Sequence, residues 1–174
     1  MESYIGRMRK TLWTIDEKDF EGLLAEGFDF SLKYFALLIL IGSALTFALA
    51  LFRTGFDLLA ALIGTVFMTL TYAAGIGIIL PIVSHLLITA LGGKRPATDT
   101  FQMYFYASTP SLLLGWVPAL GQLSPIVSFG NAFRGLREIN KFPLWKALVA
   151  VLLPSLVYWG AWIILVSGLM ALAG

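Results

Sequence analysis

The 174-residue sequence contains no cysteine and only one histidine, His85. The absence of cysteine excludes disulfides, thiolate nucleophiles and cysteine-ligated metal or iron–sulfur sites. A single imidazole has no second histidine with which to bind a metal, and no carboxylate lies inside the long apolar segments to form an acid–base pair with it. We therefore expect a protein that is not an enzyme and that holds no metal or other cofactor.

Charge is also scarce, because Asp, Glu, Lys and Arg make up 13% of the chain, whereas soluble domains average about 25%. Hydrophobic residues make up 59%. Four segments of 19, 36, 34 and 28 residues contain no charged residue: 34–52, 58–93, 100–133 and 147–174. A helix needs about 20 apolar residues to cross the hydrocarbon core of a bilayer. The sequence therefore predicts a polytopic integral membrane protein.

The basic residues predict the orientation of the chain, because cytoplasmic loops collect Lys and Arg. With five crossings and a cytoplasmic N-terminus, 11 basic residues lie in the cytoplasm and Arg53 lies outside. The net charge of +2 is too small to indicate a nucleic-acid partner. The first 32 residues lack the apolar core of a cleavable signal, so we expect the first span to serve as the insertion signal.

Two of the uncharged segments are too long for a single straight span. Residues 58–93 would form a helix of about 54 Å at 1.5 Å per residue, so we expect one span with a tilt or kink at Pro81. Residues 100–133 must turn back, as two crossings or as a re-entrant hairpin, to keep the following basic residues in the cytoplasm. Glycine and proline in segment 115–121 can supply that turn.

The predicted fold class is an all-α, five-span helical bundle with a cytoplasmic N-terminus and an external C-terminus. A cytoplasmic segment, residues 1–33, precedes the membrane domain, residues 34–174. The expected spans are 34–52, 57–91, 100–115, 120–138 and 146–172. In the N-terminal segment, Thr14 and Glu17 have capping-box spacing, and apolar residues follow at helical spacing. This pattern indicates a short interfacial helix docked on the protein's own basic loops, with a solvated linker as the alternative.

Short motifs follow one another in a characteristic order along the second half of the chain. They are Leu91-Gly-Gly-Lys94, Tyr106-Ala-Ser-Thr-Pro110, Gly135-Leu-Arg-Glu-Ile139, Trp145-Lys-Ala-Leu148 and Leu153-Pro154. The second motif ends a Phe-rich helix, and an apolar hairpin separates it from the third. This order, over residues 57–172, resembles the Yip-domain family, five-span membrane proteins named for interaction with Ypt/Rab GTPases.

The chain departs from the eukaryotic members of that family at two points. Those members carry an Asp-Leu-x-Gly-Pro motif near the entrance to the membrane domain, whereas here Asp57-Leu58 is followed by Leu59-Ala60-Ala61. The cytoplasmic segment is also only about 33 residues long. Both features are similar to the short prokaryotic or archaeal branch. We therefore expect the cytoplasmic membrane of a prokaryote or archaeon, and a Rab-type GTPase partner is not inferred.

Charged residues at the cytoplasmic ends of the expected spans are candidate contacts for lipid or a partner. These candidates are Lys94, Arg95, Arg134, Arg137, Glu138 and Lys141. Arg134 and Glu138 are four residues apart, so we expect them to pair across one helical turn. Anchoring of the topology is one interpretation of the cations, and contact with a lipid headgroup or partner is the other.

Residues that shape or interrupt the helices form a second group of candidates. They are Gly92, Gly93, Tyr106, Pro110, Pro81 and Pro154. Because proline lacks an amide hydrogen, we expect the third span to be bent or interrupted near Tyr106–Pro110. Tyr106 should then face the bundle interior, with its hydroxyl available to carbonyls left unpaired by the break. For His85, a structural or interfacial role and a proton relay are both open.

The expected function is non-catalytic. The protein would organise the membrane or recruit partners through its helical bundle and a basic cytoplasmic rim. The partners would be membrane lipid, other membrane proteins or a second copy of the chain. The alternative is a small transporter or lipid-handling permease that uses the proline-broken second and third spans.

Overall fold

The computed structural model describes residues 4–12, 17–117 and 119–173, and these fold into helices without a β-strand. Two short helices come first, α1 (Tyr4–Thr11) and α2 (Glu17–Leu24). The remaining elements are α3 (Phe28–Arg53), α4 (Leu58–Ala74), the π-helix η1 (Gly75–Ile79), α5 (Leu80–Ala90), α6 (Ala97–Ala107), α7 (Thr109–Leu114), α8 (Leu120–Asn140) and α9 (Leu144–Ala173). The prediction of an all-α fold is confirmed.

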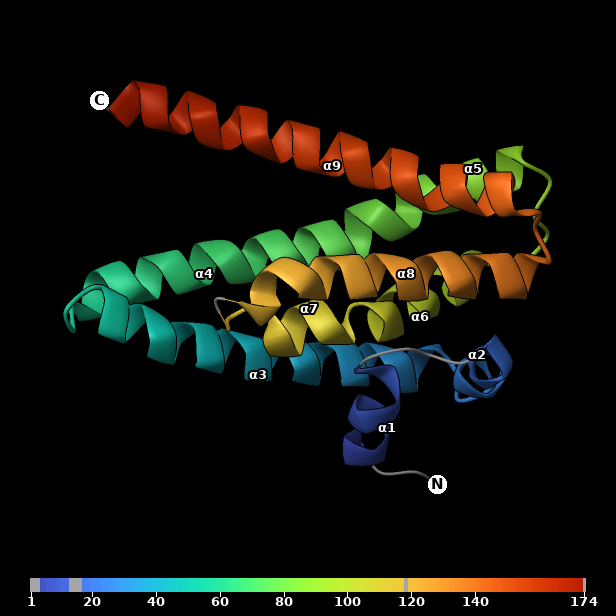
Figure 1. Ribbon diagram of the computed structural model, residues 1–174, viewed down its shortest axis with the longest axis horizontal. Helices are drawn as coiled ribbons and strands as arrows, with labels where there is room; N and C mark the ends of the chain where they lie inside the picture. Colours follow the sequence, from blue (N-terminus) through green and yellow to red (C-terminus); the bar gives the residue numbers. More distant parts are fainter. Residues whose placement is uncertain (1–3, 13–16, 118, 174) are drawn as a thin grey trace.

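The long helices run roughly along the longest axis of the molecule (Figure 1). One end, which we call the α3–α4 end, carries the α3–α4 loop, and the C-terminus of α9 lies toward the same side. The opposite end carries α2 and the α5–α6 and α8–α9 connections. We call it the basic end because the cations predicted to form a rim lie on those connections and on the last turns of α8.

Three described helical segments are long and apolar enough to cross a membrane: Phe28–Arg53, Leu58–Ala90 and Leu144–Ile164. They correspond to the expected first, second and fifth spans. The expected third and fourth spans form the hairpin of α6, α7 and α8. The turn of this hairpin stops short of the α3–α4 end (Figure 1).

Helix α6 lies at the centre of the core. Met103, Tyr104, Phe105 and Tyr106 are consecutive and all buried, which requires neighbours on every side of the helix. Helices α2, α3, α5 and α8 supply those neighbours. On α8, a Cβ added to Gly135 would lie 2.6 Å from the Phe20 ring and 2.7 Å from Met103. The glycine of the Gly-Leu-Arg-Glu-Ile motif therefore allows α2, α6 and α8 to pack closely.

Two helical segments are irregular next to a proline. Helix α6 ends at Ala107 and α7 begins at Thr109, with Pro110 in its first turn. Pro81 lies in the first turn of α5, directly after the wider turn of η1. Pro154 lies inside the continuous helix α9, so the break considered there is not formed. Membrane helices tolerate such prolines because neighbouring groups satisfy the freed carbonyl.

The N-terminal helices pack on the bundle. Phe20 and Leu23 of α2 are 1% and 2% exposed, and α2 lies against α6 and α8. The expected docking surface was the basic loops, whereas α2 lies mainly against α6 and α8; Thr14 of the expected capping box lies outside the described residues. Tyr4 of α1 stacks on Phe30 of α3 with ring centroids 5.0 Å apart. Both short helices therefore belong to the folded structure.

Candidate functional site: the basic end of the bundle

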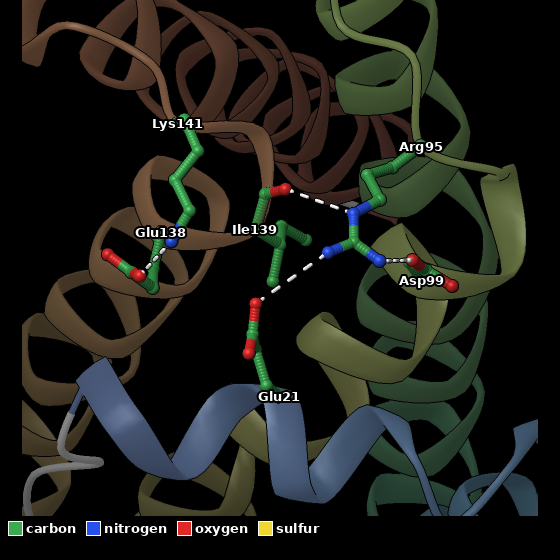
Figure 2. A network of polar contacts seen from close by, with 6 residues as sticks. All are labelled: Glu21, Arg95, Asp99, Glu138, Ile139 and Lys141. Atoms are coloured by element: carbon green, nitrogen blue, oxygen red, sulfur yellow. Dashed lines mark hydrogen bonds and ion pairs between the residues drawn. The ribbon is translucent and has the colours of Figure 1, made fainter.

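Arg95 lies where α2, α6 and α8 meet at the basic end (Figure 2). Its Nε donates a hydrogen bond of 3.2 Å to the carbonyl of Ile139, near the C-terminus of α8. Its terminal nitrogens lie 3.8 Å from a carboxylate oxygen of Glu21 and 3.6 Å from one of Asp99. A cation near a helix C-terminus also complements the helix dipole. Arg95 therefore holds three helices together and already has its anionic partners.

The two glycines of the Leu-Gly-Gly-Lys motif close the C-terminus of α5. The Gly93 amide donates to the carbonyl of Ile88 at 2.8 Å, and Gly92 has a φ of +92°, as in a Schellman motif. A Cβ added to Gly93 would lie 2.4 Å from Ile88 Cγ2. Lys146 Nζ donates to the carbonyl of Leu91 at 2.7 Å. These residues therefore bond to carbonyls at the C-terminus of α5 and fix the turn that follows it.

Helix α8 ends in the same way, with Lys141 in the left-handed conformation at φ 50° and ψ 39°. The Phe142 amide donates to the carbonyl of Arg137 at 3.0 Å. The Lys141 ammonium turns back and pairs with Glu138 (Figure 2), and this hydrogen bond raises the pKa of Lys141. Glu138 therefore pairs with Lys141, whereas the four-residue spacing predicted a pair with Arg134.

Three cations of the basic end make no ion pair or hydrogen bond with any residue that the structure describes: Lys94, Arg134 and Arg137. All three are exposed. Arg134 and Arg137 are three residues apart on α8, so they lie on neighbouring turns of the same side. Lys94 lines an open cavity of about 330 Å³ together with Arg95 and Lys141. These three side chains are the members of the predicted rim that can meet an external anion.

A family model described as the Yip1 domain matches residues 10–172. The chain belongs to the Yip1 domain family. The match begins in α1 and ends in α9, so the family domain includes α2 as well as the long helices. With its apolar helices, this Yip1-domain chain is an integral membrane protein. No curated protein and no solved structure matches the chain.

The Yip1-domain motif that ends in Pro110 lies inside the bundle, away from the basic rim. Tyr106 is 0% exposed, as expected for a side chain that faces the interior. Its hydroxyl donates to a carboxylate oxygen of Glu26 at 3.2 Å, whereas we expected a carbonyl left free by the break. The carbonyl of Tyr106 accepts instead from the Thr109 hydroxyl at 2.8 Å. A hydroxyl at the break therefore satisfies the Tyr106 carbonyl, and the Tyr106 hydroxyl bonds to Glu26 of the N-terminal segment.

A buried polar cluster surrounds this break, and sequence reasoning missed it. Arg7 of α1 forms an ion pair with Glu26, although their side chains are only 10% and 20% exposed. The hydroxyls of Thr11, Tyr34 and Thr109 lie 2.8 to 3.0 Å from one another. Arg7 and Thr11 are four residues apart on α1, but Glu26, Tyr34 and Thr109 lie far from them in the sequence. The sequence signal for this cluster was the set of polar residues near the first uncharged segment. In the sequence, these residues look the same as residues exposed to solvent.

Polar side chains in other parts of the bundle join neighbouring helices. The Ser111 hydroxyl donates to the Ser128 hydroxyl at 2.8 Å and so links α7 to α8. His85 Nδ1 lies 3.3 Å from the Thr100 hydroxyl oxygen, between α5 and α6. Such hydrogen bonds contribute about 0.6 kcal/mol each to helix packing in membranes. The contact of His85 favours its structural interpretation.

An intramembrane cavity of about 230 Å³ lies among η1, the α6–α7 break, α8 and α9. Ile76 of η1, Ser108 at the break and Tyr158 of α9 all line it. A Cβ added to Gly75 would lie 2.2 Å from the Tyr158 hydroxyl, so Gly75 makes room for that ring. The cavity touches both helix irregularities, and Tyr106 is not among its lining residues.

Proposed function

We propose that this Yip1-domain protein is a non-catalytic membrane organiser whose basic end holds anionic lipid headgroups. The observation that carries the proposal is the contrast between two groups of cations. Arg95 and Lys146 bond to helix ends and neighbouring carboxylates, whereas Lys94, Arg134 and Arg137 are exposed and unpaired among the described residues. A basic residue near an anionic membrane surface contributes about 1 kcal/mol of attraction.

In this proposal the basic end and residues 1–33 face the cytoplasm, and residues 34–174 form a five-span domain. The α6–α7–α8 hairpin then counts as the third and fourth crossings. The charge distribution supports this orientation, because 11 basic residues fall on the proposed cytoplasmic side and Arg53 falls at the α3–α4 end. We place the protein in the cytoplasmic membrane of a prokaryote or archaeon.

Replacing both Arg134 and Arg137 by glutamine should weaken binding of phosphatidylglycerol at least tenfold at low salt. Two cations contributing about 1 kcal/mol each correspond to roughly a thirtyfold change in affinity. The measurement is a titration of fluorescent phosphatidylglycerol onto the purified protein in a neutral detergent. Helix content, followed by circular dichroism, should stay the same.

The matched control is the double variant Lys33→Gln/Lys141→Gln. It removes the same charge from two cations that already pair with Asp29 and Glu138. We expect its affinity to fall less than threefold, because exposed cations held by carboxylates have less attraction left for lipid. Equal weakening in the two double variants would assign the effect to total charge and contradict the proposal.

The permease alternative has one observation in its favour. The cavity of about 230 Å³ adjoins both η1 and the α6–α7 break, where a transport pathway through interrupted helices would lie. Flux of a solute or lipid across vesicles that contain the protein, absent from empty vesicles, would favour this alternative.

A further inference from the structure

A third cavity, of about 460 Å³, lies at the α3–α4 end, away from the basic rim. Residues of α3, of α4 and of the hairpin turn line it. Four glycines also line it: Gly42, Gly64, Gly115 and Gly121. Arg53 and Gln122 line it and are exposed, so it opens at this end. Its volume lies in the range typical of ligand sites, about 300–1,000 Å³.

Two hydroxyl groups in this cavity make no hydrogen bond with any described residue, those of Thr46 and Thr65. Elsewhere in the long helices, Thr71 and Thr89 donate to the carbonyl one turn back, at 2.8 and 3.0 Å. Thr65 is 7% exposed, and its hydroxyl oxygen is fully buried. A buried hydroxyl without a partner is unfavourable in an apolar environment. The hydroxyl of Thr46, which is half-buried, is therefore available to a molecule in the cavity, and that of Thr65 becomes available on a change of its χ1 rotamer.

The antiparallel packing of α3 and α4 places these two hydroxyls at the same depth. Ser43 and Thr69 are hydrogen-bonded across the two helices at 2.7 Å. One turn toward the α3–α4 end leads from Ser43 to Thr46 and from Thr69 to Thr65. Arg53 lies two further turns along α3, about 10 Å at 1.5 Å per residue. The cavity thus has a cation at its mouth and a pair of hydroxyl donors beneath it.

We infer that this cavity binds one glycerophospholipid with ester-linked chains, taken from the leaflet at the α3–α4 end. The lipid phosphate lies at Arg53, whose long side chain extends to the headgroup layer. The ester carbonyls, which lie beneath the phosphate in such a lipid, accept hydrogen bonds from Thr46 and Thr65. One acyl chain lies along the apolar inner wall formed by Ile39, Met68 and Leu112. This site goes beyond the proposed function, since it serves the opposite end of the bundle.

The test compares phosphatidylglycerol with ester-linked chains and its diether analogue, which has the same headgroup but lacks the carbonyl acceptors. Native mass spectrometry of the unmodified protein in detergent, with both lipids supplied in equal amounts, measures which one is retained. We expect the diester to be retained about five- to tenfold more than the diether, because two hydrogen bonds of the size found between membrane helices are lost.

Substitutions in the cavity test whether the preference for the diester over the diether arises there. Thr46→Val/Thr65→Val should bring the diester-to-diether ratio to about one, because valine has the same shape without the hydroxyl. The matched control Thr71→Val/Thr89→Val removes two hydroxyls that already bond to carbonyls, so the ratio should be unchanged. Arg53→Gln should weaken retention of both lipids alike.

Equal retention of the two lipids by the unmodified protein would overturn the inference and leave the cavity to water. Displacement of the lipid by millimolar inorganic phosphate would also overturn it, by assigning the site to a free anion. Arg134→Gln/Arg137→Gln should leave the diester-to-diether ratio unchanged. The outcome at this cavity is therefore separate from the outcome at the basic rim.

Discussion

The protein with Glu26 replaced by leucine should lose about 3 kcal/mol of its free energy of unfolding. The Arg7 side chain is only 10% exposed beside Glu26, and removing one partner of a buried ion pair leaves a charge without its counterion. The Tyr106 hydroxyl loses its acceptor in the same substitution. Unfolding by a denaturing detergent, followed by circular dichroism at fixed protein concentration, measures the change.

The double variant Arg7→Met/Glu26→Leu is the decisive comparison. Replacing both members of a buried ion pair by apolar residues is often neutral, so the double variant should recover most of the stability lost in Glu26→Leu. The exposed pair of Lys33 and Asp29, 2.6 Å apart, supplies the control, and Lys33→Met should change stability by less than about 1 kcal/mol. If the double variant were as unstable as Glu26→Leu, the unpaired charge of Arg7 would not be the cause of the loss of stability in the single variant.

Gly42→Ala should destabilise the protein by about 2–3 kcal/mol, because α3 and α7 touch at this residue. A Cβ on Gly42 would lie 2.6 Å from the carbonyl oxygen of Leu112, and a backbone oxygen moves only if the two helices separate. The same unfolding measurement reports the loss.

Gly64→Ala is the matched control for that substitution. Gly64 has no neighbouring heavy atom within 4 Å of the added Cβ, and alanine stabilises a helix by about 1 kcal/mol relative to glycine. The two alanine substitutions should therefore act in opposite directions. A loss of similar size in both would show that close α3–α7 packing is not the cause.

The parts of this fold that were predictable from sequence are those that depend on local pattern. Long uncharged segments predicted α3, the α4–η1–α5 segment and α9, because a bilayer requires that length of apolar helix. Pro110 predicted the break after α6, because proline has no amide hydrogen to continue the helix. The apolar spacing after Glu17 predicted a short interfacial helix, and Phe20 of α2 is buried.

Contacts between segments that lie far apart in the sequence could not be predicted from the sequence. Arg7 and Glu26 look like solvated charges beside a membrane span, and only the packing of α1 brings them together. Arg95 was predicted as a rim residue, but the end of α8 places a carbonyl in reach of its guanidinium. Glu138 pairs with Lys141 and not with Arg134, because the left-handed backbone of Lys141 directs the Lys141 side chain back over α8.

Labelling of single cysteines tests most directly the claim that the basic end faces the cytoplasm and the α3–α4 end faces outside. The chain has no natural cysteine, so Thr54→Cys, Thr98→Cys and Ala173→Cys can each be read without background. In intact cells, a membrane-impermeant maleimide should label the cysteines at positions 54 and 173 and should label position 98 only after the membrane is opened. Labelling of position 98 from outside, or of position 173 only after opening the membrane, would contradict the account.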